Sequence, residues 1–185
     1  MKRVIAIAVG ALTVGVFAAE PARAEERTCR GTIGATTLDN VRVPDGAKCV
    51  LQGTTVQGTV KVETNAVLVA RDVRVIGNVQ AEDARNVKVV QTSRVGGSVQ
   101  VKQGKAAKVV NSKINADIQY DANNGLLRAI DNKVGGSIQV MQNTGGVVIR
   151  ANRVDGNLQC KENSPAPTGG GNVVQGNKED QCAGL

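Results

Sequence analysis

The sequence has almost no aromatic residues and no histidine. Among its 185 residues there are one Tyr and one Phe, and neither Trp nor His. A core of this size normally uses several aromatic side chains to fill its volume, so this one has to be built from Val, Ile, Leu and Ala. Without His there is no Ser–His or Cys–His pair for nucleophilic catalysis. The composition therefore excludes the histidine-dependent hydrolases.

The first 24 residues have the three parts of a secretory signal. Lys2 and Arg3 supply the positive start, residues 4–17 are almost wholly apolar or Gly, and residues 22–24 form an A-x-A cleavage site. The apolar run is too short to span a bilayer comfortably. We therefore expect cleavage after residue 24 and export to the periplasm or the medium, with no transmembrane segment in the exported protein. An uncleaved N-terminal anchor is the alternative.

An internal repeat of 19–20 residues decides the predicted fold. The motif Gly-Ser/Asn-aliphatic-Gln, as in Gly97-Ser98-Val99-Gln100, recurs in recognisable form at residues 39, 58, 77, 97, 116, 136 and 156. Aliphatic and polar residues alternate through it, which indicates a strand with one buried face. A second strand with the same alternation follows in each repeat, as in Val87-Lys88-Val89. The unit is too short for a strand and a helix, so it predicts stacked coils of short strands.

The expected fold class is all-β, a single-stranded parallel β-helix (β-solenoid) of about seven coils. We expect right-handed coiling, although the pattern alone does not fix the hand. With coils about 4.8 Å apart, the rod would be roughly 35 Å long. The β-helix domain covers residues 25–185, with an N-terminal cap over 25–38 and a C-terminal cap over 161–185, where Pro165 and Pro167 interrupt the strand pattern.

Four cysteines support this interpretation. Cys29 and Cys49 are 20 residues apart, and Cys160 and Cys182 are 22 apart, so each spacing is close to one coil. Residues one coil apart lie within the Cα separation that a disulfide tolerates. Of the three possible pairings, only Cys29–Cys49 with Cys160–Cys182 joins neighbouring coils. The alternative is that all four cysteines are free thiols. If the disulfides form, both ends of the rod are held, which favours a monomer, and no cysteine remains for a metal site.

Parts of the sequence resemble two groups of proteins. The length of the coil and its recurring Gly-Asn/Ser-Val, over residues 39–158, resemble the bactofilins, β-helix proteins of the bacterial cytoskeleton that are typically cytoplasmic and polymerise end to end. The likeness is architectural, and the export signal and the disulfide-stapled ends depart from that family. Residues 156–165, continuing to residues 175–178, resemble the end of a set of uncharacterised secreted bacterial proteins. That likeness implies a secreted β-helix and carries no known activity.

A basic column is the clearest outward feature. It stands three residues before the motif glycine and consists of Arg74, Arg94, Lys113, Lys133 and Arg153. Stacked at coil spacing, neighbouring cations repel by just under about 1 kcal/mol even in water. Such a column suits a repeating anion, such as an acidic polysaccharide, lipopolysaccharide or nucleic acid. The alternative is a solvated face, shielded by the nearby Asp72, Asp131 and Asp155, that discourages aggregation between sheets.

Two polar columns are better explained by structure than by binding. The first is the motif glutamine, which predicts an amide ladder along the rod; its members are Gln80, Gln100, Gln119, Gln139 and Gln159. Hydrogen bonding to sugar hydroxyls is the alternative role. The second column is typical of turns and consists of Ser93, Ser112, Asn132, Asn152 and Asn172.

No residues are predicted to be catalytic, and no metal or cofactor is expected. Asp117 and Asp121 near Tyr120 are the one carboxylate pair considered for glycan cleavage. The uniform coils predict no cleft. We therefore expect a non-catalytic structural or interaction protein, secreted or associated with the bacterial cell envelope, whose partners are anionic polysaccharides or envelope proteins. The alternatives are a binder of anionic polymer along the basic column and, less favoured, a polysaccharide-acting enzyme.

Overall fold

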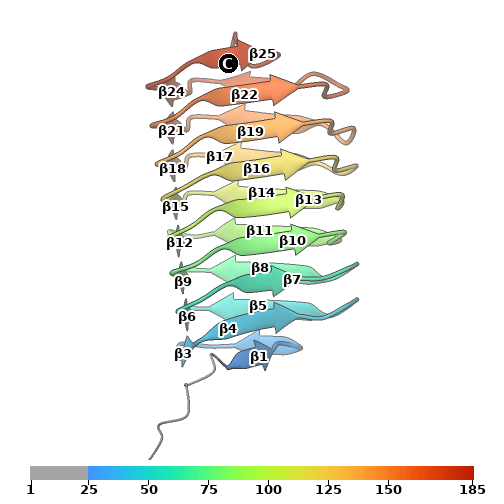
Figure 1. Ribbon diagram of the computed structural model, residues 1–185, viewed down its shortest axis with the longest axis vertical. Helices are drawn as coiled ribbons and strands as arrows, with labels where there is room; N and C mark the ends of the chain where they lie inside the picture. Colours follow the sequence, from blue (N-terminus) through green and yellow to red (C-terminus); the bar gives the residue numbers. More distant parts are fainter. Residues whose placement is uncertain (1–24) are drawn as a thin grey trace, which may run out of the picture.

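The computed structural model describes residues 25–185, and the expected signal, residues 1–24, lies outside them. The described chain folds into short parallel strands wound into one solenoid (Figure 1). No helix in this part of the chain is long and apolar enough to cross a membrane.

Three parallel sheets form the walls of the solenoid. Sheet A contains β1 (Glu26–Thr28), β4 (Asn40–Val43), β7 (Val60–Val62), β10 (Val79–Glu82), β13 (Val99–Lys102), β16 (Ile118–Asp121), β19 (Ile138–Met141), β22 (Leu158–Lys161) and β25 (Lys178–Asp180). Sheet B contains β2 (Gly31–Ile33), β5 (Lys48–Gln52), β8 (Val67–Arg71), β11 (Asn86–Val90), β14 (Ala106–Val110), β17 (Leu127–Ile130), β20 (Val147–Arg150) and β23 (Thr168–Gly170). Sheet C contains β3 (Thr37–Leu38), β6 (Thr55–Val56), β9 (Arg74–Val75), β12 (Arg94–Val95), β15 (Lys113–Ile114), β18 (Lys133–Val134), β21 (Arg153–Val154) and β24 (Val173–Val174).

Each turn of the solenoid passes through sheets A, B and C in that order. In Figure 1 the chain climbs while it runs to the right along sheet A, nearer the viewer, and returns to the left along sheet B behind it. This is right-handed coiling, the hand that parallel crossover connections almost always take. The predicted β-solenoid is therefore the observed fold.

The solenoid has about eight turns, one more than the motif predicts. The additional turn is the first, because residues 25–38 contain β1, β2 and β3 in register with the strands of the next turn. None of these three strands carries the motif, so the repeat did not reveal them. At the other end, β23, β24 and β25 fall within residues 161–185 and pair with the turn below.

The core consists of stacked aliphatic columns. On sheet A one column is completely buried from Val41 to Leu158, with one Val, Ile or Leu per turn. β-branched side chains suit a pleated and buried surface, and burying each one contributes roughly 1.5–3 kcal/mol. Tyr120 is the one aromatic side chain in this described core; its hydroxyl donates to the Arg128 carbonyl oxygen at 2.9 Å. Burial raises the pKa of Tyr120 above its ordinary value.

Polar ladders fill the corners between sheets. At the B–C corner the amide of Asn132 donates to Asn152 at 3.0 Å, and that of Asn152 donates to Asn172 at 2.9 Å. Each amide also donates to a backbone carbonyl of an earlier turn. A second buried ladder, not recognised in the sequence, occupies the A–B corner and consists of Asn123, Asn143 and Asn163. These ladders satisfy backbone groups that the corners leave outside the sheets.

The C–A corner packs backbone against backbone. A Cβ added at Gly156 would lie 2.7 Å from the Gly136 carbonyl oxygen, closer than side chains pack. Ala116 stands in the same column, and its N–H donates to the Gly97 carbonyl at 3.2 Å, whereas Gly97 donates to Gly77 at 2.9 Å. The motif glycine therefore sets how closely turns stack at this corner.

Both disulfides predicted from the cysteine spacing are present. Cys29–Cys49 joins the first two turns with a Cα separation of 5.5 Å, and Cys160–Cys182 joins the last two with 5.2 Å. All four cysteines are buried. The two open ends of the solenoid, where strand edges lack a partner, are therefore the covalently held parts.

Candidate functional site

Sheet C presents five cations in one column. We call Arg74, Arg94, Lys113, Lys133 and Arg153 the C ladder. Each is directly opposite the next in the strand register, and all five are exposed. The column is bounded by Thr55 on the N-terminal side and Val173 on the C-terminal side. The structure thus brings together all five residues singled out in the sequence.

The local strand geometry explains this alignment. Each strand of sheet C is two residues long, and in the five strands of the ladder the second residue, such as Val95 or Ile114, is buried in the core. Because side chains alternate across a strand, the first residue has to face solvent. With turns about 4.8 Å apart, the five charges span roughly 19 Å.

Within residues 25–185, no cation of the C ladder takes part in an ion pair. The ion pairs of this part of the chain are Arg42–Glu26, Arg42–Glu63, Lys61–Glu63 and Lys161–Glu162, on sheet A or at its edge. The carboxylate of Asp155, two residues after Arg153, accepts instead from Gln175 at 3.2 Å. Within residues 25–185, the ladder's positive charges are therefore not held in ion pairs.

A second basic column, not recognised in the sequence, stands on sheet B. Lys88, Lys108 and Arg128 are opposite one another in register on β11, β14 and β17. The available signal was their spacing of 20 residues, the length of one coil. Sheets B and C therefore both carry positive columns.

The glutamine column of sheet A forms an amide ladder in part. Gln80 donates to Gln100 at 3.3 Å, Gln119 to Gln139 at 3.0 Å, and Gln139 to Gln159 at 3.2 Å. At the C-terminal end Gln159 donates to the carboxylate of Glu179 at 2.7 Å. Since these amides bond to one another, the geometry favours the structural role over sugar binding.

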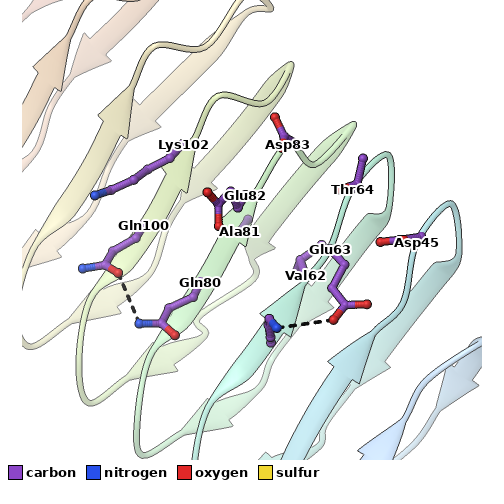
Figure 2. Close-up of a pocket in the computed structure, with 11 residues that line it drawn as sticks. Asp45, Val62, Glu63, Thr64, Gln80, Ala81, Glu82, Asp83, Gln100 and Lys102 are labelled. Carbon is purple, nitrogen blue, oxygen red and sulfur yellow. Dashed lines mark hydrogen bonds and ion pairs between the residues drawn. The ribbon is translucent and has the colours of Figure 1, made fainter.

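A groove of about 630 Å³ lies at the edge of sheet A. Figure 2 shows the Gln80–Gln100 pair on one side and acidic side chains on the other. One of these acids, Glu63, forms an ion pair with Lys61 at 3.4 Å. Four carboxylates line the groove: Asp45, Glu63, Glu82 and Asp83. No group of three or more His, Cys, Asp or Glu in residues 25–185 is arranged to hold a metal ion.

The residues considered for glycan cleavage do not form a common site. Tyr120 is buried and points into the core. Asp117 stands at the C–A corner, where its carboxylate accepts from the N–H of Ser137 at 2.7 Å. Asp121 lies on the outward side of sheet A, opposite Lys102 and Met141. The acid pair and the hydroxyl therefore belong to different environments.

The chain was compared with protein-family models, curated proteins and solved structures, and it matches none of them. What the protein binds therefore has to be inferred from its own surface.

Proposed function

We propose that this chain is a non-catalytic exported binding protein that holds a linear anionic polymer, such as an acidic polysaccharide of the bacterial envelope, along the C ladder. One observation carries the proposal: five cations stand in register, one per turn, and none is paired with a carboxylate of the described chain. A row of like charges at about 4.8 Å is electrostatically unfavourable without an anionic partner.

The solenoid suits a polymer because its charges are fixed in a line. The backbone of each turn is held by the turns on both sides, so binding does not have to order it. Long Lys and Arg side chains can shift their heads along the row to meet anions whose spacing differs from that of the coils. Because the attraction is between exposed charges, it should weaken as salt increases.

An exported location supports an envelope polymer as the partner. The two disulfides are typical of oxidising compartments, and the N-terminal sequence has the parts of an export signal. Removing residues 1–24 takes away three cations and one acid, which leaves 20 − 15 = +5. A positive exported protein meets anionic polysaccharides and lipopolysaccharide in the periplasm or outside the cell.

The test compares three forms of the oxidised protein on immobilised polygalacturonate, lipopolysaccharide and DNA, at low and moderate salt. The forms are wild type, Arg94→Glu/Lys113→Glu on the C ladder, and Lys102→Glu/Lys161→Glu on sheet A. Both variants change the net charge by the same amount. Salt-sensitive binding that only the C-ladder variant loses would support the proposal.

Two results would overturn it. The first is no binding of the wild type to any of the three polymers at low salt. The second is an equal loss in the sheet A variant, because it would trace binding to net charge alone. Arg94→Lys/Lys113→Arg keeps the charges and should keep the binding. Assay of the same polysaccharide incubations for newly formed chain ends tests the enzymatic alternative.

A further inference from the structure

The outward face of sheet B combines cations with aliphatic side chains. We define the B face by two neighbouring outward columns of its central strands: Lys88, Lys108 and Arg128 in the first, and Val90, Val110 and Ile130 in the second. Arg150 continues the second column. Sheet B is the farther wall in Figure 1.

A groove of about 430 Å³ runs between these columns. Three valines and three cations line it, together with Gln91 and Asn111; they are Val69, Val90, Val110, Arg71, Lys88 and Lys108. Val90, Val110 and Ile130 are half-buried although they face outward, and Leu126, just before β17, is 38% exposed. Outward positions on a sheet that faces water are normally polar, as the glutamines of sheet A are. The B face therefore keeps apolar surface in contact with solvent.

The charge on this face has one sign. The eight strands of sheet B contain six Lys or Arg residues and no Asp or Glu. None of the six takes part in an ion pair of the described chain, since those pairs involve Arg42, Lys61 and Lys161. A second copy of this chain packed face to face would set cations against cations, so the occupant of the B face has to be negative.

The shape of the face separates it from the C ladder. The C ladder is one residue wide and matches a line of charge. The B face is at least two columns wide, with apolar side chains beside the cations. A protein partner would present both signs of charge in a pattern, whereas a bilayer of acidic phospholipid presents uniform negative charge above an apolar interior. Uniform charge with interspersed aliphatic residues fits the bilayer.

We propose that the B face docks on anionic phospholipid surfaces. Lys88, Lys108 and Arg128 contact lipid phosphates, while Val90, Val110 and Ile130 lie against the interfacial region. Attraction of this kind is worth roughly fivefold in affinity for each Lys or Arg near the surface. The C ladder, on another wall of the solenoid, stays free to bind polymer.

Sedimentation with vesicles tests this docking. Wild-type protein should bind vesicles that contain phosphatidylglycerol and should not bind vesicles of phosphatidylcholine alone. Lys88→Glu/Lys108→Glu should reduce binding by about 25-fold or more, because two cations are lost. Arg94→Glu/Lys113→Glu makes the same change in net charge on the C ladder and should bind as wild type does. Circular dichroism of each variant checks that the fold is retained.

A second pair of variants tests the apolar part. Val90→Thr/Val110→Thr keeps the shape and β-branching of the side chains and should lower vesicle binding several-fold without changing its salt dependence. Unchanged binding would overturn the apolar contact. Equal binding to neutral vesicles, or an equal loss in the C-ladder variant, would overturn the docking itself. Displacement by glycerol phosphate at matched ionic strength would indicate a site for a single anion and would also overturn it.

Lipid docking by the B face and polymer binding by the C ladder can fail independently of each other. Vesicle binding that fails only in the sheet B variant would support it even if no polymer binds. Polymer binding that fails only in the C-ladder variant, without vesicle binding by the wild type, would overturn it and leave the proposed function in place.

Discussion

Arg27 and Lys178 occupy the same inward column at opposite ends of the solenoid. Arg27 is opposite Val41 in the first turn, and Lys178 is opposite Leu158 in the last. The residues between them in this column are fully buried aliphatics, whereas Arg27 and Lys178 are exposed. The apolar column therefore ends in a positive charge at both ends. Stacking two copies end to end would bring these charges about 4.8 Å apart.

We predict that these two charges keep the protein monomeric. Replacing both with valine, Arg27→Val/Lys178→Val, removes the repulsion and extends the apolar column to ends whose strand edges are already open. Light scattering coupled to gel filtration should show elongated oligomers for this variant and a monomer for the wild type. Arg27→Lys/Lys178→Arg keeps the charges and should stay monomeric. A monomeric valine variant would show that the charges are not what blocks stacking.

The disulfides should stabilise the ends of the rod. Each closes a loop of about 20 residues, and the chain-entropy relation assigns roughly 3 kcal/mol to such a loop. Cys29→Ser/Cys49→Ser should therefore lower the free energy of unfolding in urea by about that amount. Amide exchange should accelerate first in β1, β2 and β3, since only the second turn then holds them. Equal acceleration along the whole rod would contradict this local effect.

The fold was predictable because its signals are local and repeat. One aliphatic residue per coil, from Val41 to Leu158, and cysteines one coil apart are sufficient to indicate stacked turns. The first turn was missed because β1 and β2 do not carry the motif. Their sequences are Glu-Arg-Thr and Gly-Thr-Ile. Their place in the solenoid is set by pairing with β4 and β5, which is a tertiary relationship.

The basic column of sheet B was harder to find, because corner lengths vary between coils. Lys88 and Lys108 stand 11 residues after their motif glycines, whereas Arg128 stands 12 after Ala116. The A–B corner of that coil is longer, because five residues separate β16 from β17 and only three separate β13 from β14. Strand pairing restores the register in space, so counting from the motif cannot align the column.

Removing one amide from the B–C corner ladder should be strongly destabilising. Asn152 accepts from the N–H and the amide of Asn132 and donates to the carbonyl of Ala129 and the amide of Asn172. Asn152→Ala leaves several of these buried groups without partners, at about 1–3 kcal/mol each. We expect a loss of roughly 3 kcal/mol or more in urea unfolding. Asn152→Ser should cost less, because Ser112 occupies this column and bonds to backbone carbonyls. Equal losses would contradict the ladder's role.

Tyr120 should link stability to alkaline pH. Burial raises the pKa of Tyr120 in the folded protein, whereas in the unfolded chain the hydroxyl ionises at about pH 10. The neutral hydroxyl is therefore favoured by folding: this contribution is complete below about pH 10 and is lost as the pH rises toward the folded pKa. Because Tyr120 is the single tyrosine and Trp is absent, tyrosinate absorbance reports Tyr120 alone. This absorbance should appear together with the loss of the circular dichroism signal.

Tyr120→Phe should lower the free energy of unfolding by about 1 kcal/mol at neutral pH, because the bond to the Arg128 carbonyl is lost. The stability of this variant should fall less steeply above about pH 10. If the Tyr120 hydroxyl titrated with a midpoint of about pH 10 in protein that is still folded, that result would contradict its buried position.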